Sequence, residues 1–151
     1  MYKYLTAILL LPLFLNSSVL AEILIINVES ASNNGLALIG IYDKEENFGK
    51  AKVNKKLNTE KILTGAATEI SNNKAQIKLD VPFGSYVVSG FQDFDGNGVI
   101  SGNFLGIPKE PFGFSNDAKG RFGPPKWQDA VFVFNKSNQK ITLRLKNYNN
   151  Q

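Results

Sequence analysis

The chain has no cysteine and no histidine among its 151 residues, and it has only one methionine and one tryptophan. Without cysteine it forms no disulfide and cannot carry a lipid anchor on an amino-terminal cysteine, so its stability has to come from packing or from a bound ion. Without histidine, the usual zinc sites, histidine-dependent triads and imidazole acid–base catalysis are excluded. These absences predict a protein that is not an enzyme.

Long hydrophobic runs are also scarce, and the one that stands out lies at the amino terminus. Lys3 precedes the apolar run from Leu5 to Leu15, and Ala21 supplies the small residue typical of a cleavage site. The run is too short for a typical membrane span, although an uncleaved anchor is the alternative. We expect residues 1–21 to be a signal peptide, residues 22–151 to form a single β-sandwich domain, and the protein to be periplasmic or secreted, without stable membrane insertion.

The formal net charge is +4, and much of the positive charge falls within residues 44–61. This segment can be interpreted as a patch for anionic lipid, glycan or nucleic acid, or as a solvated loop whose glutamates offset part of the charge. Aromatic residues do not alternate with the lysines as they would on a nucleic-acid surface. We therefore favour the solvated loop and expect no nucleic-acid partner.

Short β-branched and alternating runs separated by turn residues predict strands with little helix. In residues 75–81, for example, Ala75, Ile77, Leu79 and Val81 alternate with polar residues. The predicted strands are residues 22–29, 36–43, 75–81, 85–93, 127–135 and 139–147. We expect the first two to form a hairpin, the last two to form another, and residues 59–70 to make an excursion between strands. The pattern indicates an all-β fold, an antiparallel Ig-like or prealbumin-like β-sandwich of about seven strands.

Residues 94–126 show no strand periodicity, and a connection of this length is unusual in a compact domain. Disorder fits poorly, because the segment is rich in phenylalanine as well as in glycine and proline. We expect one long, ordered loop that covers an end or an edge of the sandwich.

The start of this loop carries oxygen-bearing side chains at alternate positions, as the front half of an EF-hand calcium loop does. The candidate metal ligands are Asp93, Asp95, Asn97, Val99, Ser101 and Asn103. Phe104 stands where an EF-hand has its bidentate glutamate, and a strand rather than a helix precedes the loop. The sequence therefore predicts a weak calcium site that is not an EF-hand and needs a further ligand from Asn103, Glu110 or Asp117. The alternative is an Asx-rich turn that binds nothing.

The same loop offers residues for other kinds of site. The candidate ligand-binding residues are Phe104, Glu110, Phe112, Phe114 and Trp127. With Phe122, the aromatic members of this set would make a platform for a sugar or a peptide, or else a satellite core that pins the loop. The least favoured alternative is a hydrolase that uses Glu110 with Asp117 or Asp129 as a carboxylate pair.

Two longer motifs carry resemblances. The stretch "LDVPFGSYVVSGFQD" is similar to the strand entry of prealbumin-like and Cna-B-like β-sandwiches, and "GFQDFDGNGVISGNFLGIPKEPFGFSND" followed by "FGPPKWQDAVFVF" resembles domain of unknown function 2141, a family of small secreted bacterial proteins. The second resemblance covers nearly the whole chain after the signal peptide and implies a β-sandwich that is exported, but no activity. We therefore expect an exported, non-enzymatic β-sandwich whose calcium loop orders a surface for a protein or glycan partner.

Overall fold

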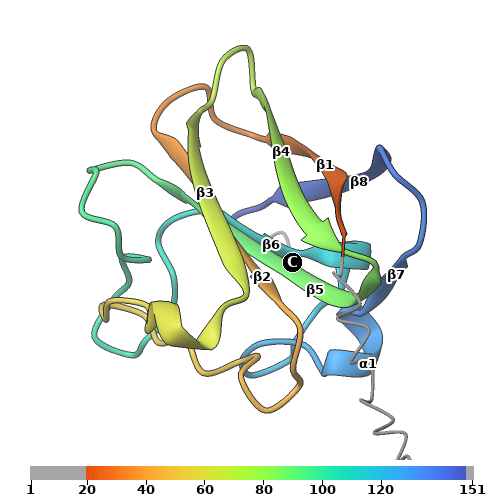
Figure 1. The fold of residues 1–151 in the computed structure, drawn as a ribbon. Coiled ribbons are helices and arrows are strands. Elements are labelled where there is room, and N and C mark those ends of the chain that lie inside the picture. Colours follow the sequence, from red (N-terminus) through yellow and green to blue (C-terminus); the bar gives the residue numbers. More distant parts are fainter. Residues whose placement is uncertain (1–19, 149–151) are drawn as a thin grey trace, which may run out of the picture.

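The structure is a computed structural model that describes residues 20–148, so the predicted signal peptide lies almost wholly outside the described residues. These residues form eight strands in two sheets, which confirms the predicted all-β sandwich (Figure 1). The strands are β1 (Ala21–Ser30), β2 (Leu36–Tyr42), β3 (Thr64–Glu69), β4 (Lys74–Pro82), β5 (Gly84–Asp93), β6 (Phe112–Phe114), β7 (Phe132–Phe134) and β8 (Gln139–Leu145).

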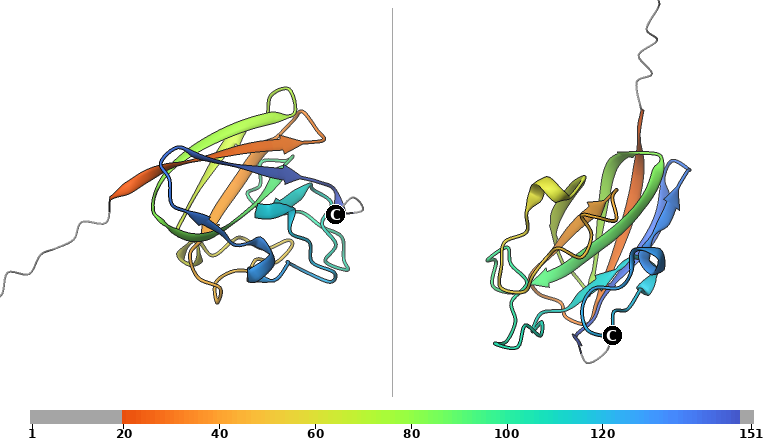
Figure 2. Two further views of the ribbon diagram at one scale, coloured as in Figure 1. Left: turned by 90° about the vertical axis from the view of Figure 1, so that its right-hand side faces the viewer. Right: turned by 90° about the horizontal axis from the view of Figure 1, so that it is seen from below.

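One sheet has three strands in the order β4-β1-β8, and the other has five, in the order β3-β2-β5-β6, with β7 pairing to the far end of β5. Figure 2 shows the two sheets as layers seen from the side and from below. The main core lies between them and contains Leu24, Ile26, Ile41, Val88 and Phe134, which are all fully buried. Burial of this apolar surface is the main stabilising term of such a fold.

The sequence located most of the strands and their faces correctly. In β4 the predicted inward residues are buried or half-buried, whereas Gln76, Lys78 and Asp80 are exposed. In β8, Leu143 and Leu145 are buried as expected. At the β4–β5 turn the Tyr86 hydroxyl donates to the carbonyl oxygen of Pro82, at 2.8 Å.

Both predicted hairpins are wrong. β1 pairs with β4 and β8, whereas β2 lies in the other sheet and pairs with β3 and β5. Likewise β7 pairs with β5, and β8 pairs in parallel with β1, so the sandwich is not purely antiparallel. The physical reason is that an apolar face can be buried by crossing to the opposite sheet as well as by pairing with the next strand.

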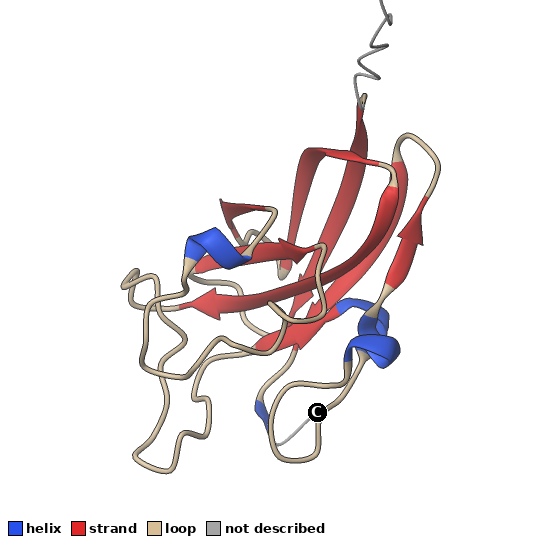
Figure 3. Cartoon of the chain, turned by 60° about the horizontal axis from the view of Figure 1, so that its bottom comes forward, coloured by secondary structure: helices blue, strands red, loops and turns tan. Residues whose placement is uncertain are grey.

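Two segments differ from their predicted form. Residues 64–69 form the edge strand β3 rather than an excursion, and a short 3₁₀ helix, η1 (Thr59–Lys61), precedes it. Of the predicted strand at 127–135, the first part is a single helical turn, α1 (Trp127–Ala130), and only Phe132–Phe134 is extended. A second short 3₁₀ helix, η2 (Ser115–Asp117), precedes α1 in the chain (Figure 3). None of them is long and apolar enough to cross a membrane.

Candidate functional site

The candidate site begins where β5 ends, at Asp93. The Asp93 side chain is 2 % exposed, and its carboxylate accepts hydrogen bonds from three backbone N–H groups. Those of Gly96 and Gly98 are 2.8 Å away, and both glycines have positive φ, which lets the chain curl tightly around the carboxylate. Asp93 therefore organises the whole DFDGNG turn.

Glu110 reaches the same place through the register of β5 and β6. The antiparallel pairing of Phe91 with Phe112 extends beyond the end of β6, since the Gln92 N–H donates to the carbonyl oxygen of Pro111 at 2.8 Å. Two residues further along this register, Asp93 stands opposite Glu110. The Glu110 side chain is 3 % exposed, and its two oxygens accept from the N–H groups of Phe94 (2.9 Å) and Ser101 (2.7 Å).

A third carboxylate completes the group. One carboxylate oxygen from each of Asp93, Asp95 and Glu110 lies within 4.8 Å of the others, with Asp95 on the exposed side. We call these three residues the acidic centre. Two buried carboxylates and one at the surface, converging from two segments, can hold a metal ion.

The electrostatics of the acidic centre are dominated by Asp93. Burial raises the pKa of this carboxyl group, but hydrogen bonds from the backbone N–H groups of Gly98, Gly96 and Asn97 outweigh burial. The net effect is a pKa below the usual value of 3.8. Asp93 is therefore charged at neutral pH although it is buried.

Among the described residues, no basic side chain forms an ion pair with this charge. Within residues 20–148, the ion pairs involve Glu29, Asp117, Arg144 and Lys146, and none of them includes a member of the acidic centre. Two unit charges 4.8 Å apart repel each other by about 3 kcal/mol at an effective dielectric constant of about 20, and by less where solvent screens Asp95. A cation among these oxygens would turn that repulsion into attraction.

The other predicted metal ligands surround the acidic centre to different degrees. The Asn97 amide donates to Asp95 and to the Ser101 hydroxyl, at 2.8 and 3.2 Å, so these polar groups adjoin the centre. The Val99 N–H donates to the Asn97 amide oxygen at 2.7 Å. In contrast, the Asn103 amide oxygen accepts from the N–H groups of Leu105 and Ile107, which closes a separate turn. Of the three residues expected to complete the ligand set, the structure brings Glu110 to Asp93 and Asp95.

A buried glutamine next to Asp93 was missed by the sequence analysis. Gln92 is fully buried, and its amide accepts from the Ser30 hydroxyl at 2.5 Å and donates to the carbonyl oxygens of Ser32 and Asn34. These bonds fasten the β1–β2 connection to the end of β5. The sequence did contain a signal for it: Gln92 is a polar residue within the predicted strand at residues 85–93. A buried glutamine needs hydrogen-bond partners, so such a residue can be expected to fasten neighbouring segments.

The aromatic candidates divide into two groups. Phe114 and Trp127 pack around Phe48, with ring centroids 5.8 and 6.0 Å from it, in a second cluster that includes Tyr42, Val87 and Ala130. Phe112 lies 6.0 Å from Phe114 and is half-buried. By contrast, the rings of Phe104 and Phe122 are 95 % and 94 % exposed. Phe114 and Trp127 thus anchor the loop as members of the predicted satellite core, whereas Phe104 and Phe122 are exposed to solvent.

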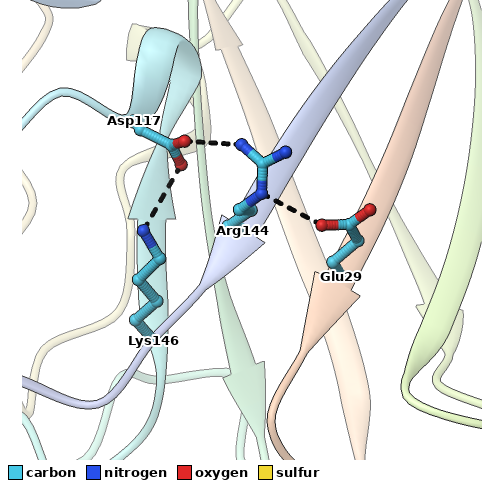
Figure 4. A network of polar contacts seen from close by, with 4 residues as sticks. All are labelled: Glu29, Asp117, Arg144 and Lys146. Atoms are coloured by element: carbon cyan, nitrogen blue, oxygen red, sulfur yellow. Dashed lines mark hydrogen bonds and ion pairs between the residues drawn. The ribbon is translucent and has the colours of Figure 1, made fainter. Parts of the chain in front are cut away.

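The carboxylates proposed for a hydrolase have different partners. Asp117 accepts from Arg144 at 2.5 Å and lies 3.7 Å from the ammonium group of Lys146, and Arg144 also contacts Glu29 (Figure 4). The Asp117 hydrogen bond and charge raise the pKa of Arg144. Asp129 is exposed on α1. Since Glu110 is engaged with the DFDGNG turn and Asp117 with cations, this geometry gives no support to a catalytic pair.

Comparison with known protein families identifies a match to this chain. The family model described as "Uncharacterized protein conserved in bacteria (DUF2141)" matches residues 25–142, a span that includes the acidic centre and all or part of each strand. No curated protein and no solved structure matches the chain significantly. The family description carries no activity that could be assigned to Asp93, Asp95 or Glu110. Because the match covers most of the sequence, the chain belongs to the bacterial DUF2141 family.

Proposed function

We propose that the acidic centre of Asp93, Asp95 and Glu110 binds a calcium ion, and that the ion fixes the long loop that follows β5. The observation that carries this proposal is the burial of Asp93 and Glu110, 2 % and 3 % exposed, without a basic partner in the part of the chain that the structure describes. Buried charges in proteins are normally paired or coordinated to metals. The bonds that the carboxylates accept from backbone N–H groups satisfy part of their capacity but do not neutralise them.

Calcium is favoured over other cations by the donor chemistry. All the candidate ligands are oxygens, since the chain has neither cysteine nor histidine. Calcium takes six to eight oxygens in flexible geometry, whereas magnesium demands a near-octahedral set and keeps several waters. The exposed position of Asp95 leaves room for water to complete the coordination. Affinity in the range of extracellular modules, about 0.1–1 mM, suits such a partly open site.

An ion at this position would act on the loop through bonds that are already present. Glu110 accepts from Phe94 and from Ser101, and Asp93 holds the turn between them. Fixing the two carboxylates would therefore fix both ends of the DFDGNG turn. We further propose that the protein is exported, as its signal-like residues 1–21 suggest, and that it acts by binding a partner rather than by catalysis.

The direct test is a calcium titration of chelator-treated protein, followed by thermal melting. At about 5 mM calcium, a site with a dissociation constant of about 0.1–1 mM stabilises the folded state by about 1–2 kcal/mol. For a domain of this size the melting temperature should rise by several degrees, about 3–8 °C. Magnesium at the same concentration should raise it less. An unchanged melting temperature of the wild type in calcium would contradict the proposal.

The substitution Asp95→Asn gives a second, sharper readout. It removes one of three crowded charges, so without calcium the variant should be as stable as the wild type or slightly more stable. With calcium it should lose most of the stabilisation, since one ligand charge is gone. Asp80→Asn is the matched control, because Asp80 is an exposed aspartate on β4. Equal calcium responses in Asp95→Asn and Asp80→Asn would show that the ion binds elsewhere.

A further inference from the structure

A large groove lies on the outer face of the five-stranded sheet and is not explained by the acidic centre. It has a volume of about 1430 Å³, larger than the roughly 300–1,000 Å³ of ordinary small-molecule sites. Its floor consists of the outward-facing residues of β2, β3 and β5, several of them small: Gly40, Gly65, Ala67 and Ser89. Small side chains at these positions keep the sheet surface free for a ligand.

Two loops form the walls of the groove and are joined to each other. One is the lysine loop (residues 49–58), and the other is the segment between Asp95 and Glu110, which contributes residues 97–100 and 105–108 to the lining. Asn54 connects them: its N–H donates to the carbonyl oxygen of Ile100 at 2.9 Å, and its amide oxygen accepts from the N–H of Gly102 at 2.8 Å. In Figure 1 both loops lie on the β3 side of the molecule. The two loops are therefore hydrogen-bonded to each other and together border the groove on the outer sheet face.

The lining of the groove is mostly apolar. It includes the phenylalanines Phe91, Phe112 and Phe114 and the isoleucines Ile62, Ile100 and Ile107. Leu63, Leu105 and Phe122 also line it although they are exposed to solvent. Exposed apolar surface of this extent, set in a groove, is typical of a binding site.

The charge of the groove has one sign. Among the described residues that line it, the only charged side chains are Lys52, Lys55 and Lys56, and no aspartate or glutamate lines it. The same three lysines, with Lys50 and Lys61, line a smaller cavity of about 230 Å³ next to it. Within residues 20–148 none of these lysines takes part in the ion pairs of the fold. Their positive charge is thus available to a ligand.

We propose that this groove binds a long-chain anionic amphiphile of the fatty-acid class, with the hydrocarbon chain along the sheet and the acidic head at the lysine loop. The apolar floor and walls suit a hydrocarbon chain, because its transfer from water is favourable in proportion to the area buried. The unpaired lysines complement one acidic head group. This inference does not depend on the proposed calcium ion, because the floor, Asn54 and the lysines are in place without one.

The experiment measures binding of monomeric oleate to the full mature chain by calorimetry, with calcium and with chelator. Oleyl alcohol has the same chain without the charge, and octanoate has the charge with a short chain. We expect oleate to bind with one-to-one stoichiometry and at least about tenfold more tightly than either analogue. Binding that persists in chelator separates this proposal from that of the calcium site.

Two variants locate the bound ligand. Ala67→Trp places a large ring on the exposed floor of β3 and should weaken oleate at least about tenfold. Val133→Trp is its control, because Val133 is an exposed residue of β7 that does not line the groove.

The second variant reverses the charge of the lysine loop. Lys52→Glu/Lys55→Glu/Lys56→Glu should weaken oleate binding about tenfold or more but change the binding of oleyl alcohol little. Its control is the same reversal at the exposed residues Lys74, Lys78 and Lys140 of the other sheet.

These binding measurements can either support or overturn the proposed fatty-acid site. Loss of oleate binding in the groove variants and not in their controls supports it, and the lysine variant alone suffices if Ala67→Trp does not fold. Absence of oleate binding, or equal effects of variants and controls, overturns it. Binding to anionic phospholipid vesicles without binding of monomeric oleate overturns it in favour of docking on a membrane surface.

Discussion

Two groups of carboxylates in this molecule differ in the partners that the fold gives them. Asp117 lies near the surface and has two cations, with Arg144 at 2.5 Å and Lys146 at 3.7 Å. Asp93 and Glu110 are buried and accept only from backbone N–H groups. Physical chemistry would suggest the reverse, because a charge needs compensation most where water is excluded.

This difference indicates that the negative charge of the acidic centre is left for a bound cation to balance. The fold can place arginine and lysine beside a carboxylate, as the network around Asp117 shows (Figure 4). At the acidic centre it places only hydrogen-bond donors. Backbone donors orient a carboxylate and lower its pKa but leave its charge, and an oriented set of negative oxygens is what calcium requires.

The largest expected effect comes from deleting the two central carboxylates of this comparison. Asp93→Ala leaves the N–H groups of Gly96 and Gly98 without their acceptor and should lower the free energy of unfolding by about 2–3 kcal/mol in chelator. Asp117→Asn removes the partly exposed ion pairs with Arg144 and Lys146, tolerates the positive φ of this position, and should cost less than about 1 kcal/mol. Urea denaturation measures both. If the two losses were equal, the backbone bonds of Asp93 would contribute no more than a surface ion pair.

An intermediate effect is expected on acidification. Because the pKa of Asp93 is lower in the folded than in the unfolded chain, its stabilisation is fully present above the usual value of 3.8. The contribution is lost as the pH falls through the lower, folded-state pKa. The stability gap between wild type and Asp93→Asn should therefore narrow progressively below about pH 3.8 in chelator. A gap that stayed constant down to pH 2 would mean that the pKa of Asp93 is not lowered by folding.

The smallest effect should follow from changes to the surface network. Arg144→Met removes the contacts to Asp117 and Glu29, which are solvent-exposed and screened by salt. We expect its melting temperature to match that of the wild type closely, and the small remaining difference to vanish in about 0.5 M sodium chloride. A large, salt-resistant loss would show that Arg144 has a structural role that the comparison with the acidic centre does not capture.

The lysine loop is exposed, as a solvated loop would be, but it makes a tertiary contact that the local sequence did not indicate. Lys52, Lys55 and Lys56 look like a solvated charge run, and the nearby glutamates look like their partners. In the structure the loop crosses to Ile100 and Gly102 through Asn54 and forms a wall of the apolar groove. Nothing in the spacing of the lysines indicates a contact with residues almost fifty positions away.

The acidic centre was only partly predicted, because one of its three residues comes from a distant part of the sequence. Asp93 and Asp95 share one short turn, and their alternation with Asn97 and Gly98 is visible in the sequence as a calcium-type loop. Glu110 could only be named as one of several possible completing residues. Its place opposite Asp93 follows from the register of β5 and β6, and β6 is too short to be recognised from its own residues.

By itself, then, the sequence determined the local features of this protein: the alternation that makes strands, the turn that curls around Asp93, and the absence of cysteine and histidine that limits its chemistry to oxygen ligands. The tertiary structure decided which strands pair, that β1 and β8 run in parallel, that Glu110 joins Asp93, and that the lysine loop frames a groove. Local features depend on near neighbours and are visible in the sequence. Pairings between distant segments depend on how both sheets bury their apolar faces at once, which only the folded chain resolves.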